Sequence, residues 1–204
     1  MTSNPLQKTF TFDKAFQEQV QFHLSKYPVE RKASAVIPLL DLAQRQLGGS
    51  ISQEAVEHVA EILSISPMRV LEVASFYTML NLDPVGKHHV QVCTTTPCWL
   101  RGSDAIMETC RQTLGLQNGE VSQDGKFSLM EVECLGACVN APMVQINDDY
   151  YEDLTPETMK KLLEDLAKDK QPSIGPQLKR QTSAPISGPK TCLENLKDKT
   201  NAIG

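Results

Sequence analysis

The hydrophobic residues in the first part of the chain recur with the period of amphipathic helices. Within residues 13–80, four successive stretches place apolar side chains three or four positions apart, which puts them on one face of a helix. The positions are Phe16, Val20 and Leu24; Val36, Leu39, Leu40 and Ala43; Val56, Val59, Ala60 and Leu63; and Val70, Val73, Ala74 and Tyr77. The pattern predicts a helical bundle, to which we assign residues 1–86.

Residues that begin and end helices lie between these stretches. Gly48 and Gly49 follow the second stretch, and glycine is typical of helix ends. Ser52 precedes the third stretch and Ser66 the fourth, where Pro67 takes the first helical position. Serine caps and proline at the first position both favour helix starts. The four stretches are therefore expected to form separate helices.

The pattern changes after about residue 87 to alternating strands and helices. The expected elements are a strand over 89–93, a helix over 103–114, strands over 126–133, 143–147 and 150–152, and a last helix opened by Thr155 and Pro156. This is a β-α-β-β-α order with one short extra strand. It predicts an α+β or α/β domain over residues 87–169, built on a small sheet.

The last part of the chain is rich in proline, glycine, serine, lysine and glutamine. Residues 170–204 contain few apolar side chains, too few to form a core of their own. We expect this segment to be extended or disordered and to bind a partner protein.

Composition narrows the class of protein. The chain has 204 residues and a net charge of −5, so nothing in it favours nucleic acid or an anionic membrane surface. Its start lacks the charged and then apolar pattern of a signal peptide, and its apolar stretches are shorter than the roughly 20 residues that span a bilayer. We therefore expect reduced thiols and no direct membrane insertion.

Four of the six cysteines form two closely spaced pairs. Cys93 and Cys98 are separated by four residues, and Cys134 and Cys138 by three. The first pair falls where the first strand runs into the next helix, and the second pair follows the next strand, so the two can meet at one edge of the sheet. The spacing favours a 2Fe-2S cluster, which takes four thiolates, two for each iron.

Two other readings of the paired cysteines stay open. A structural zinc site would make the chain a zinc-stapled adaptor, but zinc motifs usually leave about two residues between paired cysteines. A thiol-disulfide oxidoreductase would use a CxxC motif, and neither pair has that spacing. Both alternatives predict a protein without iron.

Three sequence motifs resemble one family of proteins. They are CTTTPCWLRG at 93–102, ECLGACVNAPM at 133–143 and FYT at 76–78. The chain resembles, over roughly residues 10–170, the thioredoxin-like 2Fe-2S subunits of the NADH-oxidising module of respiratory complex I (NADH-quinone oxidoreductase). The resemblance implies a thioredoxin-like ferredoxin domain after the helical bundle, with the cluster ligands on Cys93, Cys98, Cys134 and Cys138.

The resemblance also implies a function. The chain would be an electron-transfer subunit that exchanges single electrons with the flavin of a partner, and the isolated chain would be inactive with NADH. FMN and NADH would lie on that partner in the peripheral arm of complex I, on the cytoplasmic side of a bacterial inner membrane or the matrix side in mitochondria. The same subunit of an NAD-linked hydrogenase or formate dehydrogenase is the alternative.

The residues around the cysteines have expected roles. Gly136 allows the backbone to approach a sulfur or to adopt a positive φ, and Pro97 stiffens the first loop. Arg101 either offsets the anionic cluster or is a solvated charge at a helix start. Trp99 either packs beside the cluster or serves as a core or interface anchor.

Other candidates have plainer readings. Cys110 lies at helical spacing with its apolar neighbours and is expected to be a core thiol, and Cys192 in the tail is expected to be a free thiol. His88 and His89 point to opposite faces of a strand, so they cannot share one metal and are expected at the surface or an edge. Phe76 and Tyr77 are expected in the core.

Overall fold

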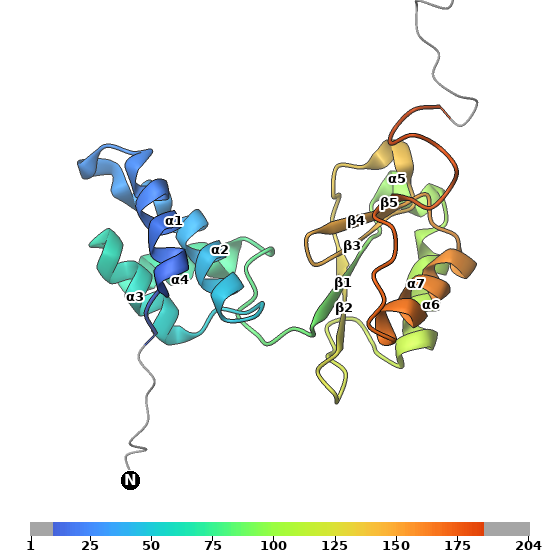
Figure 1. Cartoon of the computed structure of the whole chain (residues 1–204), viewed down its shortest axis with the longest axis horizontal. Coiled ribbons are helices and arrows are strands. Elements are labelled where there is room, and N and C mark those ends of the chain that lie inside the picture. The colour runs from blue at the N-terminus through green and yellow to red at the C-terminus, as the bar shows by residue number, and fades with distance from the viewer. Residues whose placement is uncertain (1–9, 186–204) are drawn as a thin grey trace, which may run out of the picture. The chain divides into compact units, whose positions relative to one another are not determined.

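A computed structural model describes residues 10–185 and divides the chain into two units between Lys87 and His88. The division lies one residue after position 86, where the sequence places the end of the helical bundle. Cys192 and residues 186–204 of the expected tail lie outside the described residues. Figure 1 shows the helical unit in blue and blue-green and the second unit in green to red.

The first unit consists of helices, as its hydrophobic period predicts. Its elements are α1 Lys14–Ser25, the 3-10 helix η1 Val29–Ala35, α2 Val36–Gln46, α3 Gln53–Leu63 and α4 Pro67–Phe76. Ser52 Oγ accepts a hydrogen bond from the Ala55 N–H at 3.2 Å, and Ser66 Oγ accepts one from the Met68 N–H at 3.3 Å. Both predicted serine caps are confirmed.

The predicted apolar faces form the core of this unit, except at its last position. The fully buried side chains include Leu39, Leu40, Leu63, Val59 and Val70. Phe76 and Tyr77 are 76% and 40% exposed, so their expected place in the core is wrong. Phe76 lies two positions after the buried Ala74 and so on another face of α4, while Tyr77 has extended backbone and leaves the helical face.

The second unit is built on a five-stranded sheet. Its strands are β1 His88–Cys93, β2 Phe127–Val132, β3 Val144–Ile146, β4 Asp149–Glu152 and β5 Gly175–Pro176, in the order β2-β1-β3-β4-β5. β1 pairs in parallel with β2, with Cys93 opposite Val132, and antiparallel with β3. β4 pairs antiparallel with β3 and in parallel with β5. The first four strands confirm those predicted from the sequence.

Among the described residues, three α-helices and the 3-10 helix η2 Cys138–Asn140 complete the second unit. The α-helices are α5 Thr96–Leu100, α6 Ser103–Leu114 and α7 Pro156–Ala167. Helices α6 and α7 lie side by side next to the sheet (Figure 1), and their apolar faces form one core with the strands. Cys110 is buried in this core, which confirms the reading of it as a core thiol. The arrangement of helices on a mixed sheet agrees with the expected α+β or α/β class.

Part of the segment assigned to a separate tail contacts the second unit. β5 at Gly175–Pro176 extends the sheet, and the Gln177 N–H donates to the Glu152 carbonyl at 2.8 Å. The sequence did not predict this strand, because two residues of glycine and proline carry no strand period. The chain from Gly175 to Gln177 therefore lies against strand β4 and does not belong to a separate tail.

His89 corrects another expectation. Its side chain is only 8% exposed, and its Nδ1 lies 2.8 Å from the Ser128 Oγ. β1 lies between β2 and β3, so a residue in the middle of the sheet is covered where an edge residue would be open. His89 is thus a buried residue of the sheet.

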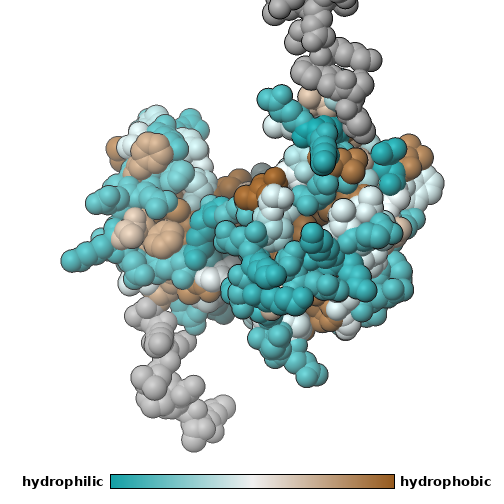
Figure 2. Space-filling view, turned by 45° about the vertical axis from the view of Figure 1, so that its right-hand side comes forward, coloured by the Kyte–Doolittle hydropathy of each residue, from teal (hydrophilic) through white to brown (hydrophobic). Residues whose placement is uncertain are grey.

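The surface is mostly hydrophilic but is interrupted by hydrophobic residues (Figure 2). In the second unit the exposed large apolar side chains include Trp99, Leu100, Val139 and Leu178. Within residues 10–185, no helix has the length and apolar character needed to cross a membrane.

Candidate metal centre

The first cysteine pair lies where strand β1 ends and helix α5 begins. Cys93 is the last residue of β1, and Cys98 lies within α5. Thr95 caps α5 with extended backbone, and its Oγ1 lies 3.4 Å from the Cys93 Sγ. Both thiols of this pair are buried. The short helix α5 turns the chain after β1, so the thiols of Cys93 and Cys98 lie near each other.

The second pair lies in the loop that follows β2. Gly136 has φ +82°, a backbone conformation that favours glycine, and its N–H donates to the Cys134 Sγ at 3.4 Å. The two sulfurs of Cys134 and Cys138 lie 3.6 Å apart, and both side chains are exposed. The predicted role of Gly136 is confirmed in both of its parts.

The parallel pairing of β1 and β2 brings the two pairs together. The carboxyl ends of parallel strands meet at one edge of a sheet, and here Cys93 pairs with Val132, two residues before Cys134. The Leu135 backbone is near enough to the Cys93 thiol to lower its pKa, and the Thr95 side chain does the same for Cys134. Each loop therefore affects the acidity of a thiol in the other loop.

A small apolar cluster surrounds the buried side of the site. It consists of Cys93, Cys98, Ala141 and Met143, with Leu135, Ala137 and Tyr150 packed against them. The Tyr150 hydroxyl donates to the Leu135 carbonyl at 2.8 Å, and the Cys93 N–H donates to the Met143 carbonyl at 3.4 Å. Contacts from β3 and β4 thus hold the second cysteine loop over the end of β1.

The four thiols differ in their acidity. Burial opposes ionisation of Cys93, but hydrogen bonds led by the one from Thr95 bring its pKa below the ordinary value. Burial, with the neighbouring Cys93 thiol, raises the pKa of Cys98 to about 12. The Gly136 N–H lowers the pKa of Cys134, while the contact with Cys134 raises the pKa of Cys138. One thiol of each pair is thus the easier to ionise.

The donor set fits a 2Fe-2S cluster. It offers four thiols in two pairs, with N–H and hydroxyl donors directed at the sulfurs, which is how proteins hold and tune such clusters. Within residues 10–185, no three His, Cys, Asp or Glu side chains have the arrangement that holds a single metal ion.

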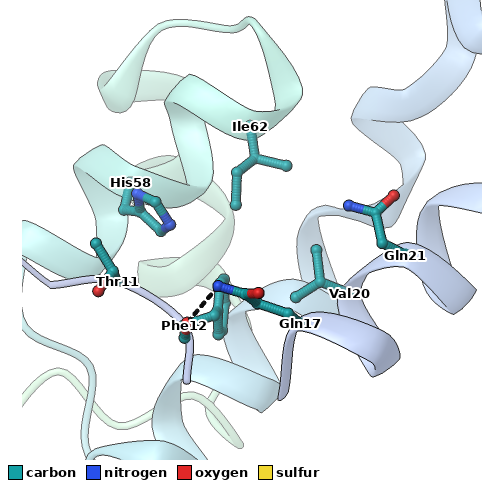
Figure 3. Close-up of a pocket in the computed structure, with 7 residues that line it drawn as sticks. All are labelled: Thr11, Phe12, Gln17, Val20, Gln21, His58 and Ile62. Atoms are coloured by element: carbon teal, nitrogen blue, oxygen red, sulfur yellow. Dashed lines mark hydrogen bonds between the residues drawn. The ribbon is translucent and has the colours of Figure 1, made fainter. Parts of the chain in front are cut away.

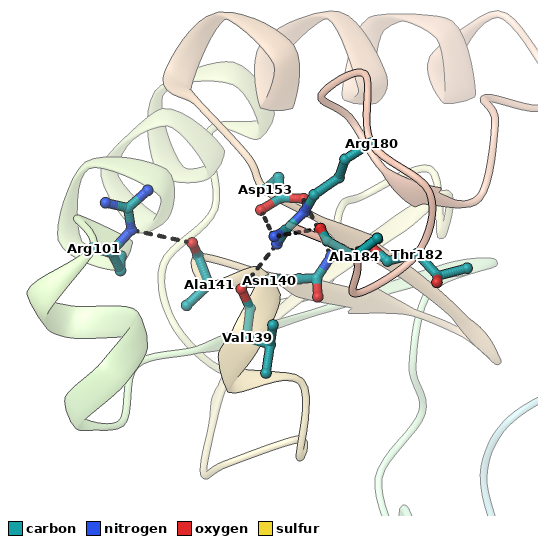
Figure 4. Close-up of polar contacts among 8 residues, drawn as sticks. All are labelled: Arg101, Val139, Asn140, Ala141, Asp153, Arg180, Thr182 and Ala184. Carbon is teal, nitrogen blue, oxygen red and sulfur yellow. Dashed lines mark hydrogen bonds and ion pairs between the residues drawn. The ribbon is translucent and has the colours of Figure 1, made fainter. Parts of the chain in front are cut away.

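The residues beside the first pair have the following positions. Pro97 is at the start of helix α5, where its fixed φ suits the helix. Trp99 is 56% exposed, so the reading of it as a core residue is wrong. Arg101 Nε donates to the Ala141 carbonyl at 3.5 Å, so this guanidinium links the end of α5 to the segment that follows Cys138 (Figure 4).

Sequence reasoning missed three residues around the site. Thr95 Oγ1 lies 3.4 Å from the Cys93 sulfur. Asn140 donates to the Thr182 carbonyl, and Arg180 donates to the carbonyl of Val139, which follows Cys138. Thr95 could have been found as a hydroxyl between two cysteines. Arg180 could not, because its position in a polar segment gives no sign of its partners.

A separate hollow lies in the helical unit. Its volume is about 270 Å³, and it is lined by Thr11, Phe12, Gln17, Val20, Gln21, His58 and Ile62 (Figure 3). The Gln17 Nε2 donates to the Phe12 carbonyl at 3.0 Å. The His58 ring contacts those of Phe10 and Phe12. These contacts make His58 part of the aromatic packing of this unit.

Comparison with known proteins identifies close relatives. A family model described as Thioredoxin-like [2Fe-2S] ferredoxin matches residues 20–167. The E subunit of the NADH-quinone oxidoreductase of Rickettsia bellii is 61% identical over 160 residues, which cover 78% of this chain and 96% of that protein. The mitochondrial NADH dehydrogenase [ubiquinone] flavoprotein 2 of Dictyostelium discoideum is 54% identical over 185 residues, which cover 91% of this chain and 75% of that protein.

A solved structure shares the fold. An NAD+-reducing [NiFe]-hydrogenase in the H2-reduced state aligns with a TM-score of 0.58 and 18% sequence identity. The alignment covers 67% of this chain and 23% of the hydrogenase chain. At this identity the likeness concerns the fold alone.

Proposed function

This chain belongs to the thioredoxin-like [2Fe-2S] ferredoxin family, and we propose that Cys93, Cys98, Cys134 and Cys138 hold its single 2Fe-2S cluster. The observation that carries this proposal is the meeting of the two cysteine loops. Cys93 pairs with Val132, two residues before Cys134, and the Leu135 backbone and the Thr95 side chain each lower the pKa of a thiol in the opposite loop. A pair of thiols from each loop is what the two irons of such a cluster require.

The chain is an electron-transfer subunit of NADH-quinone oxidoreductase. Relatives with 61% and 54% identity are named as the E subunit of that enzyme and as a flavoprotein 2 of NADH dehydrogenase. The hydrogenase is only 18% identical. The comparison therefore favours the complex I subunit over the equivalent subunit of an NAD-linked hydrogenase.

The two cysteine pairs would hold opposite sides of the cluster. When bound, a 2Fe-2S cluster accepts and releases one electron at a time. Cys93 and Cys98 provide the buried side and Cys134 and Cys138 the exposed side. The exposed side leaves a short path to a partner, because both cysteines of this pair are exposed. N–H groups that point at sulfur favour the more negative, reduced state.

NADH and FMN are expected on a partner subunit. The sequence contains no GxGxxG and no GxxxxGK[ST] motif, so neither of these phosphate-binding loops is available on this chain. A flavin-bearing, NADH-binding subunit would then supply the electrons, and this chain alone would not oxidise NADH. The proposal places both proteins in the peripheral arm, on the cytoplasmic or matrix side of the membrane.

Ligand replacement tests the site. Cys134→Ala removes a thiolate from an exposed position, so we expect the purified variant to lose most of its iron and acid-labile sulfide. Cys110→Ala also removes one thiol, but from the core, and it should retain the cluster of the unmodified protein. A Cys134→Ala protein with a full complement of iron and sulfide would contradict the assignment.

A further inference from the structure

A segment near the C-terminus runs past the second cysteine loop. Residues 175–184, which we call the strap, begin as strand β5 beside β4. The Gln177 N–H donates to the Glu152 carbonyl at 2.8 Å, which continues the pairing for one more residue. From there the strap passes the segment that follows Cys138 (Figure 4).

Arg180 is the main contact between the strap and the rest of the unit. Its Nε and Nη2 donate to the two oxygens of Asp153, both at 2.7 Å. The same Nη2 donates to the Val139 carbonyl at 2.8 Å. The two charged side chains are only 8% and 6% exposed, so little water competes for them. A bidentate pair of this kind fixes the plane of the guanidinium.

Asn140 also bonds the segment after Cys138 to the strap. It lies in the 3-10 turn η2 Cys138–Asn140, and its side chain is buried. Its Nδ2 donates to the Thr182 carbonyl at 3.0 Å and to Asp153 Oδ2 at 3.2 Å. Val139 and Asn140, the two residues directly after Cys138, are therefore both bonded to the strap.

The charge of Arg180 is balanced within this network. The Asp153 carboxylate takes up the positive charge in a two-fold contact, so the pair adds no net charge near the cysteines. What Arg180 provides is a fixed position for the Val139 carbonyl and, through the backbone, for Cys138. Partners outside the ligand shell commonly orient ligands in this way.

We propose that the strap is a clamp for the second cysteine loop and that Arg180 is a positioning residue for Cys138. The inference rests on the proposed function, because it assumes that Cys138 is a cluster ligand. By holding Val139 and Asn140, the strap keeps the exposed thiol of Cys138 beside that of Cys134, whose sulfur lies 3.6 Å away. The strap thus limits the movement of the Cys134 and Cys138 loop, which is the exposed side of the site.

The test compares Arg180→Met with Lys179→Met in the full chain. Both variants remove one positive charge from neighbouring positions, but Lys179 is exposed and makes none of the contacts described for Arg180. The cluster is challenged with an iron chelator, and its visible absorption is followed with time. We expect Arg180→Met to lose the cluster about tenfold faster than the unmodified protein, and Lys179→Met to match the unmodified protein.

Two further readouts separate positioning from general stability. The reduction potential and the paramagnetic spectrum of the reduced cluster should change in Arg180→Met and not in Lys179→Met. Arg180→Lys, which keeps the charge but loses the fork, should fall between Arg180→Met and the unmodified protein. Equal chelation rates and equal spectra for Arg180→Met and Lys179→Met would overturn the proposal.

A second variant serves as a control in case Arg180→Met does not fold. If Arg180→Met does not fold, the double variant Arg180→Met with Asp153→Asn removes both buried charges together and keeps a residue that tolerates the φ of +53° at position 153. This variant should fold and release its cluster quickly, and failure of both variants to fold would make Arg180 a purely structural residue and reject the proposal. An unmodified protein without iron would instead reject the proposed function.

Discussion

Among single residues, Cys110 contrasts with the cysteines of the site because its thiol lies wholly inside the core. Burial raises its pKa to about 12, so the thiol stays neutral in the folded protein. In the unfolded chain it would ionise near the ordinary thiol pKa of about 8.5. Cys110 therefore stabilises the fold below that pH, and its contribution is lost as the pH rises through the two values.

Labelling with iodoacetamide tests whether the Cys110 thiol is buried and neutral in the folded protein. In the apoprotein at about pH 8.5, we expect Cys134 to be alkylated quickly, because it is exposed and its pKa is lowered. Cys110 should react only after the protein is unfolded, because its neutral thiol is a poor nucleophile. Mass spectrometry of the digested protein distinguishes the two sites. Equal labelling of both in the folded apoprotein would show that Cys110 is not sealed in the core.

Protonation of His89 should make the free energy of unfolding depend on pH. Burial lowers its pKa, whereas the unfolded chain binds a proton below about pH 6.5. Protonation then favours the unfolded state, so the free energy of unfolding should fall as the pH drops below that value. His89→Gln should remove part of this fall, as measured by denaturant unfolding at about pH 7.5 and pH 5. An unchanged pH dependence in the variant would contradict the buried neutral histidine.

At the scale of elements, sequence and structure agree wherever an element is long enough to show its period. Helix α6 was predicted over 103–114 and occupies those residues, ending at Gly115 with φ +67°. Helix α7 begins after the Thr155 cap, as predicted. The period of apolar residues and the chemistry of the caps are both local, so one sequence carries them.

Helix α5 and the long-range contacts of the strap could not be predicted. Helix α5 has five residues, which is too few to display a helical period. The contact of Arg180 with Asp153 joins residues 27 positions apart, and no local pattern marks either as a partner. The cysteine spacing predicted the proposed ligand set, but it gave no sign of the strap beside the second cysteine loop.

Cluster removal should affect the elements unequally. The loops around Cys98 and Cys134 form no regular ladder across the site, so they depend on the cluster for order, as metal sites commonly couple to folding. We expect hydrogen exchange to increase in these loops when iron is removed, and the helices before Leu80 to change little. Exchange measured on apoprotein and holoprotein checks this. Equal protection of the cysteine loops in the two forms would contradict the proposed ligand set.

For the whole molecule, the division into two units separates two tasks. The second unit holds the cysteine site, while the helical unit contains none of the four proposed ligands. The exposed Phe76 and Tyr77 of the helical unit, and Trp99 and Leu100 next to the site, are apolar surface of the kind that partner proteins cover. Deletion of residues 169–204 would remove the strap as well as the rest of the tail, so it could not separate partner binding from cluster retention.

The most direct test of the account is the electron paramagnetic resonance spectrum of the isolated full chain after reduction with dithionite. One 2Fe-2S cluster takes up a single electron, so we predict a signal that integrates to about one unpaired electron per chain and disappears on reoxidation. A colourless protein that binds zinc and gives no signal would contradict the electron-transfer function. It would point instead to a zinc-stapled adaptor or a dithiol protein.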